Sequence, residues 1–223
     1  STFFNHASSE SLEISGPMDN GLEIQLHALM KNLAFKHLHL QIDDEWSCGV
    51  IHKMLQKRQS INDMIIRLQN KLCNVQRTKD FFMSLPLFRN LTISLLSSLW
   101  LRPENIQSIL DDDVIMHLIA CCTNSLDLKD TETAFTASGV ARAFQTVCNS
   151  QKDLSASFNM PASEFNLLYE RIKLNPRFIV NRHCAVHINS GATLRYCDEW
   201  YGKRKIAIYR NISSIHSYVQ RFQ

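Results

Sequence analysis

The stretch FFMSLPLFRN LTISLLSSLW L, residues 81–101, is the most apolar part of the chain, and it decides the predicted fold. Its large apolar side chains fall on nearly every side of a helix, and Pro86 suits a first helical turn, where its missing N–H costs nothing. Because a helix that is apolar all round must be covered on all sides, the pattern predicts a central helix. Pro86 and Arg89 interrupt the run, so it is unsuited to span a bilayer.

Amphipathic helices are predicted on both sides of this stretch, from apolar residues spaced about 3.6 positions apart. The predicted segments are about 20–40, one after Asp43-Asp44, 61–72 behind a capping-box-like Ser60, one opened by Pro103, one after Asp111-Asp112-Asp113, 130–148, Pro161 to Leu174, and 212–222. The fold class expected is therefore mainly α, an irregular multi-helix domain of about eight or nine helices. No internal repeat of fixed length stands out, which argues against a regular solenoid.

Beyond Pro176 the apolar period changes from 3.6 to 2, which predicts a small antiparallel sheet near the C-terminus. A two-residue turn that places Trp200 opposite Lys203 brings Glu199 opposite Arg204 and Asp198 opposite Lys205, two pairs of opposite charge. The predicted organisation has three parts. Residues 1–19 form a flexible arm, 20–175 a helical domain, and 176–223 a basic β-hairpin and C-terminal helix packed on that domain.

Composition places the chain among globular proteins. Of its 223 residues, 45% are hydrophobic and 20% charged, with only six Gly and five Pro, which excludes a disordered or low-complexity chain. The seven cysteines are an odd number and lie mostly in apolar, helix-like stretches, so we expect reduced thiols packed as small hydrophobic groups. Reduced thiols and the lack of a signal-peptide pattern at Ser1–His6 predict an intracellular protein, in the nucleus or the cytoplasm.

Charge divides unevenly along the chain. Residues 171–223 hold ten Lys or Arg against two acids, a net charge of +8, whereas residues 1–170 carry a net charge of −5. Long-range attraction of an acidic partner to the C-terminal quarter follows from this asymmetry. The residues predicted to bind the partner lie in or just beyond the hairpin turn and are Lys203, Arg204, Lys205 and Arg210.

Two clusters were weighed as metal sites. His183 and Cys197 fall opposite each other if residues 189–191 form a three-residue turn, but two ligands make only half of a zinc site. Asp111, Asp112 and Asp113 complement the dipole of the helix that they precede, which explains the acidic run without a cation. We therefore predict no metal and no cofactor.

No serine elbow, zinc-protease, phosphate-loop or dinucleotide motif is present in the sequence. We therefore predict a non-catalytic protein–protein interaction module, such as a scaffold, an adaptor or a complex subunit. Its helical groove is expected to bind an acidic segment or an amphipathic helix of a partner. A homodimer is a further arrangement in this interpretation, and no membrane partner is expected. One alternative is a nucleic-acid-binding module of winged-helix-like element order, with Lys203-Arg204-Lys205 at the wing tip. A second alternative is an enzyme with dispersed Cys and His residues.

Overall fold

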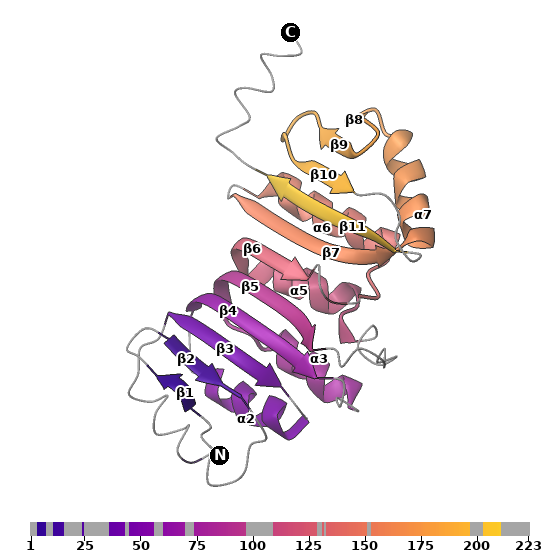
Figure 1. Ribbon diagram of the computed structural model, residues 1–223. Coiled ribbons are helices and arrows are strands. Elements are labelled where there is room, and N and C mark those ends of the chain that lie inside the picture. Colours follow the sequence, from indigo (N-terminus) through magenta and orange to yellow (C-terminus); the bar gives the residue numbers. More distant parts are fainter. Residues whose placement is uncertain are drawn as a thin grey trace.

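The structure is a computed structural model (Figure 1). It describes residues 4–7, 11–15, 24, 36–42, 45–55, 60–69, 74–96, 109–128, 131, 133–150, 153–196 and 203–210. The predicted C-terminal helix over 212–222 and most of the predicted helix over 20–40 lie outside these residues.

One sheet of eleven strands runs through the described part of the chain, in the order β1-β2-β3-β4-β5-β6-β7-β11-β10-β9-β8. The strands are β1 Phe4–Ala7, β2 Ser11–Ile14, β3 His37–Ile42, β4 Ser60–Gln69, β5 Leu87–Leu96, β6 Cys122–Leu128, β7 Leu154–Pro161, β8 Phe178–Val180, β9 Cys184–His187, β10 Thr193–Tyr196 and β11 Lys203–Arg210. The helices are α2 Glu45–Leu55, α3 Val75–Met83, α5 Asp112–Cys121, α6 Ala137–Asn149 and α7 Ala162–Lys173.

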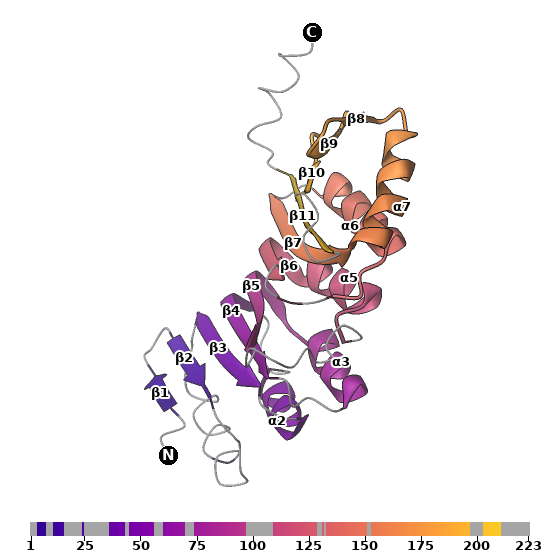
Figure 2. The same cartoon turned by 45° about the vertical axis from the view of Figure 1, so that its right-hand side comes forward.

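Strands β2 to β7 are parallel and lie side by side in the order of the sequence, so each strand pairs with the next one along the chain. The five described helices cover the same side of the sheet, as Figures 1 and 2 show. Strand β1 pairs antiparallel with β2, and strands β8 to β11 form an antiparallel meander that joins the sheet through β7. This is an α/β solenoid, and the prediction of a mainly α domain with eight or nine helices is wrong.

A row of apolar residues, one from each parallel strand, explains how the strands stack. Successive members of the row are direct partners in register and are at most 1% exposed, and the row consists of Leu12, Leu38, Met64, Leu91, Leu126 and Ala156. Each repeat alone cannot bury its apolar face, but stacking turns these faces into one continuous core under the helices. The intervals between members are 26, 26, 27, 35 and 30 residues, and this irregularity hides the repeat from a search for a fixed period.

The central helix predicted over 81–101 does not form. Phe81 and Phe82 end helix α3, Pro86 lies in the link that follows, and β5 begins at Leu87. Within β5, Leu91 and Ile93 are 1% exposed whereas Thr92 between them is half-buried, the alternation of a strand with one covered face. The helix predicted over 61–72 is likewise replaced by strand β4.

Helices α2, α5, α6 and α7 form where the sequence predicts helices, whereas the capping-box-like Ser60 begins strand β4. Asp111 is the N-cap of α5, where its Oδ1 accepts a hydrogen bond from the Val114 N–H at 3.1 Å, as the helix-dipole interpretation of the acidic run requires. Lys79 of α3 donates to Oδ2 of Asp111 at 2.5 Å. Although partial burial opposes it, these hydrogen bonds hold the pKa of Asp111 below its usual value.

The three predicted parts of the chain belong to one sheet. Two strands, β1 and β2, lie within the segment 1–19 that was expected to be a flexible arm. Strand β11, from the predicted basic segment 176–223, pairs along its whole length with β7 of the predicted helical domain. No described helix is long and apolar enough to cross a membrane.

Candidate interaction surface

The side of the sheet turned away from the helices is called the open face. On β2 to β7 it is lined by two rows of side chains that are direct partners in register, Ser11, His37, Asp63, Asn90, Ser125 and Ser155 in the first row and Glu13, His39, Ile65, Thr92, Asp127 and Ser157 in the second. All twelve are half-buried, in contrast to the fully buried apolar row on the other side. Eleven of the twelve are polar, so the open face is a hydrogen-bonding surface.

Hydrogen bonds join the first row into a chain. The carboxylate of Asp63 receives the Asn90 amide N–H at 2.5 Å on one oxygen and lies 2.7 Å from His37 Nδ1 on the other. The Asn90 carbonyl oxygen in turn accepts from the amide of Asn124 at 2.6 Å and from the hydroxyl of Ser125 at 2.8 Å. Four neighbouring strands are thus linked by polar contacts that hold these side chains in one arrangement.

The second row has its own contact and borders a small hollow. The Ser157 hydroxyl donates to Asp127 Oδ1 at 2.8 Å, across strands β6 and β7. The hollow lies on β2 to β4 and has Ile65 in it. Its lining also includes Glu13, His39, Gln41 and Arg67, together with Ile14 and Leu40. The lining combines an acid, a cation and neutral hydrogen-bonding groups with aliphatic ones, so it suits the polar end of a side chain from a partner.

The four residues predicted to bind a partner lie in strand β11. Lys203, Arg204 and Lys205 lie within β11, in register with Pro161, Met160 and Asn159 of β7, so the predicted wing tip is an internal strand. Arg204 faces the helices, where its guanidinium carbon lies 4.6 Å from the centre of the Phe165 ring. Lys205 is exposed and occupies the alternate, open-face position.

Arg210, the last residue of β11, is tied to the helical layer. Its guanidinium donates to the backbone oxygen of Cys148 at the end of α6, at 3.1 Å. Arg204 and Arg210 therefore support the fold, and Lys205 is the predicted cation that the structure places on the open face with an exposed side chain. No side chain of Lys203 is described.

The predicted hairpin forms, but its register differs by one residue. Tyr196 pairs with Ile206 and Arg195 with Ala207, whereas Trp200 opposite Lys203 would pair Tyr196 with Ala207. Because side chains alternate, this shift turns the opposite face of β11 toward the helices: Ile206 and Ile208 are buried there, and Tyr209 faces the other side. Tyr196 packs against Phe165 of α7, with ring centres 4.8 Å apart. The Glu199 and Asp198 pairs fall on residues outside the described part.

Within the described residues no three metal-ligating side chains come together. His183 is exposed in the turn after β8, and its backbone oxygen accepts from the Tyr196 N–H at 3.0 Å. Cys197, its predicted partner, lies outside the described residues.

Cys148 and His187, which are far apart in the sequence, come together with Ser190 at the turn between β9 and β10. His187 Nδ1 lies 2.8 Å from the hydroxyl of Ser190, which is also hydrogen-bonded to the Cys148 thiol and accepts from the Ala192 N–H at 3.3 Å. Burial raises the pKa of Cys148, in spite of Ser190 and Arg210, which lower it. Ser190 is only 7% exposed. A protonated thiol and a buried hydroxyl suit a turn held together by hydrogen bonds better than they suit a nucleophile.

A sequence signal for the open face does exist. Strand β4 reads apolar-x-x-apolar-x-apolar over Ile61, Met64 and Ile66, and strand β5 repeats the pattern 27 positions later over Phe88, Leu91 and Ile93. The pattern marks a strand with one covered face, and the residues between the apolar positions are those of the open face.

Fold and surface together define a class of protein, a one-sheet α/β solenoid with helices on one side and a polar sheet face on the other. Comparison with family models, with curated proteins and with solved structures finds no match for this chain.

Proposed function

We propose that this chain is a protein-interaction module that binds a partner protein on the open face of its sheet. The observation that carries the proposal is the continuous polar surface formed by six parallel strands, on the side away from all five described helices (Figure 2). The binding surface is thus a sheet face and not the helical groove expected from the sequence.

The chemistry of the open face supports recognition. Short Ser, Thr and Asn side chains make up half of its rows and lie mainly on β5 to β7, so a partner can approach the sheet closely along these strands. The chain from His37 through Asp63 to Asn90 is already hydrogen-bonded in the free protein. Binding therefore orders few additional side chains, which lowers the entropic cost of association.

The two alternatives gain no comparable support. Helices α6 and α7 are separated by strand β7, whereas a winged helix brings two consecutive helices before its wing. Arg204 and Lys205 point to opposite faces of the sheet, which gives no single basic stripe for phosphates. In the Cys148 and His187 cluster, Cys148 is buried, which raises the pKa of its thiol and keeps it protonated at neutral pH, and His187 is half-buried.

A long side chain placed in the middle of the open face tests the proposal. Thr92→Arg obstructs the second row, and Ala141→Arg adds the same side chain to an exposed position on α6 as a control. Both variants are first compared with the wild type by thermal unfolding. We expect quantitative affinity purification from a cell extract to recover a set of proteins with the wild type and Ala141→Arg that Thr92→Arg loses. Recovery of the same proteins by Thr92→Arg in equal amounts would contradict the proposal.

A further inference from the structure

We infer that the open face of the C-terminal meander is the docking site for an acidic protein segment that carries aliphatic side chains. This inference rests on the proposed function and adds the chemistry of the partner. The site is called the meander patch and consists of Tyr209, Thr193, Val186 and Ile179 with the flanking residues Arg195, Arg177, Lys205 and Ile188.

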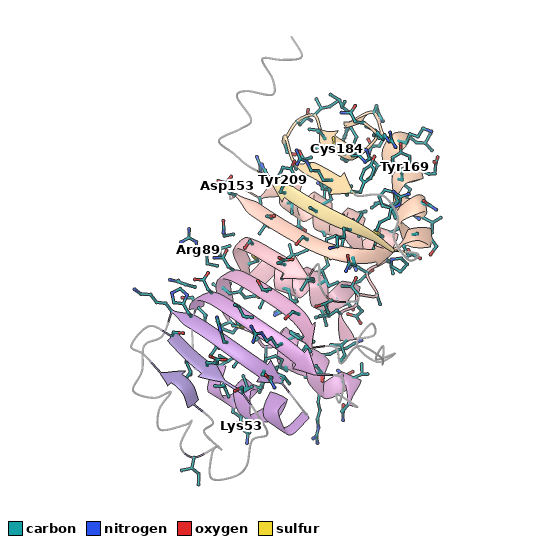
Figure 3. The ribbon with its side chains drawn as sticks, viewed as in Figure 1. Lys53, Arg89, Asp153, Tyr169, Cys184 and Tyr209 are labelled. Atoms are coloured by element: carbon teal, nitrogen blue, oxygen red, sulfur yellow. The ribbon has the colours of Figure 1, made fainter. Side chains whose placement is uncertain are left out.

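Register brings the centre of the meander patch together. Tyr209 pairs with Thr193, Thr193 with Val186, and Val186 with Ile179, so the four side chains form one row across β11, β10, β9 and β8. The neighbours of this row in sequence face the helices, since Phe178 stacks on Phe144 of α6 at 5.4 Å. The row therefore continues the open face, and Figure 3 shows where Tyr209 and Cys184 lie on this part of the sheet.

The character of the surface changes along this row. On β2 to β7 the open face is almost entirely polar, whereas here it carries Ile179, which is 36% exposed, beside half-buried Val186. Ile188, at 51% exposed, follows β9, and its N–H donates to the backbone oxygen of Arg177 at 2.9 Å. Exposed aliphatic groups gathered on a sheet face are typical of a contact surface.

Charge identifies the partner. Residues 174–196, which follow helix α7 and run to the end of β10, include three Arg and no Asp or Glu. Arg177 and Arg195 are exposed beside the row, and the Arg195 guanidinium carbon lies 5.5 Å from the centre of the Tyr209 ring. Lys205 of β11 occupies the same face two residues from Ala207, the partner of Arg195. Asp153, just before β7, is an acidic residue at the border of this cationic end (Figure 3). Carboxylates of a partner complement this field, and its aliphatic side chains cover the isoleucines.

The same features favour a protein over other anionic partners. Single-stranded nucleic acid stacks its bases on exposed aromatic platforms, whereas the exposed side chain of the row is the aliphatic Ile179 and Tyr209 is half-buried. A membrane surface binds through clusters of four or more cations with protruding apolar side chains, whereas Val186 and Tyr209 are half-buried in the sheet.

The test begins with a display library of random 12-residue peptides selected against the immobilised whole chain. Enriched peptides are synthesised with a fluorophore, and their binding is measured by anisotropy at low and high salt. A 20-base-pair DNA duplex and vesicles containing phosphatidylserine are measured in parallel. The variants are Ile179→Asp and Arg195→Glu, with Leu167→Asp as a control because Leu167 is exposed on α7, on the helix side. Thr92→Arg reports on the remainder of the open face.

We expect enrichment of Asp and Glu together with Leu, Ile or Val, and binding that falls about tenfold or more with Ile179→Asp or Arg195→Glu while Leu167→Asp leaves it unchanged. High salt should weaken the same binding. Peptides that lose binding only with Thr92→Arg would overturn this inference and leave the proposed function intact. Peptide binding that none of Ile179→Asp, Arg195→Glu and Thr92→Arg weakens would overturn both this inference and the proposed function. Binding of the duplex or vesicles in place of peptides would overturn the choice of partner.

Discussion

Glycine at position 139 is expected to be essential for packing, although it lies in a helix. An ideal Cβ on Gly139 would overlap with the carboxylate of Asp112 from α5 and with the ring of Phe135. Asp112 cannot simply move, because its two oxygens accept from the Thr136 N–H at 2.8 Å and the Thr136 hydroxyl at 2.7 Å. Gly139→Ala therefore has two opposing effects: a helix-propensity gain of about 1 kcal/mol stabilises the protein, and the overlap of the new Cβ with Asp112 and Phe135 destabilises it.

The magnitude follows from these contacts. Overpacking a filled site costs about 1–3 kcal/mol, and moving a carboxylate away from its donors costs about 1.5–3 kcal/mol for each hydrogen bond lost. After the propensity gain is subtracted, Gly139→Ala should lower the free energy of unfolding by about 2–4 kcal/mol. Gly49 in α2 is the matched control, because a Cβ there meets nothing within 4 Å. Gly49→Ala should stabilise the protein by about 0.5–1 kcal/mol.

Urea unfolding followed by circular dichroism measures both changes through the midpoint at constant slope. The reasoning is refuted if Gly139→Ala unfolds at the same urea concentration as the wild type or at a higher one. A double substitution, Gly139→Ala with Asp112→Ala, separates the contributions. It should recover the part of the loss that is due to the Asp112 overlap and retain the part due to Phe135.

Further predictions concern the core, the helix caps and pH. Leu91→Ala should cost about 2–5 kcal/mol because Leu91 is 1% exposed, whereas Thr92→Ala, one residue further and on the open face, should cost less than about 1 kcal/mol in the same urea experiment. Asp111→Ala removes the N-cap of α5 and should lower the free energy of unfolding by about 1 kcal/mol at pH 7. The loss should be smaller at pH 2, because the lowered pKa of Asp111 contributes stability that is lost as pH falls through the folded-state pKa. Burial raises the pKa of Cys122 from 9.0 to about 11, so its contribution to stability is complete below pH 9 and is lost as pH rises toward 11. Cys122→Ala should make the melting temperature fall less steeply over that pH range, and an unchanged slope would contradict the raised pKa of Cys122. Iodoacetamide at pH 8 should also modify Cys122 more slowly than the partly exposed Cys184.

Local signals in the sequence were sufficient to place α5 and α7, but similar signals at Ser60 and Pro86 lie at the starts of strands β4 and β5. Asp111 marks the start of α5 by accepting a hydrogen bond from the Val114 N–H, and Pro161 marks the start of α7 through the fixed φ of its ring, so no distant part of the chain is needed to place them. The change of apolar period after Pro176 was sufficient for the antiparallel pair of β10 and β11 for the same reason. The asymmetry of charge is a property of composition and holds whatever the fold.

Tertiary structure decided the strands and therefore which side chains form the open face. Apolar residues at 61, 65, 68 and 72 fit one stripe of a helix, yet Met64 and Ile66 are buried while Ile65 lies on the open face. A helix closes its hydrogen bonds within four residues, whereas β4 closes them with β3 and β5, whose register partners lie 26 and 27 positions away. Short-range periodicity cannot record such partners. The meander patch depends on them entirely, because Ile179, Val186 and Tyr209 become neighbours only when four strands align in register.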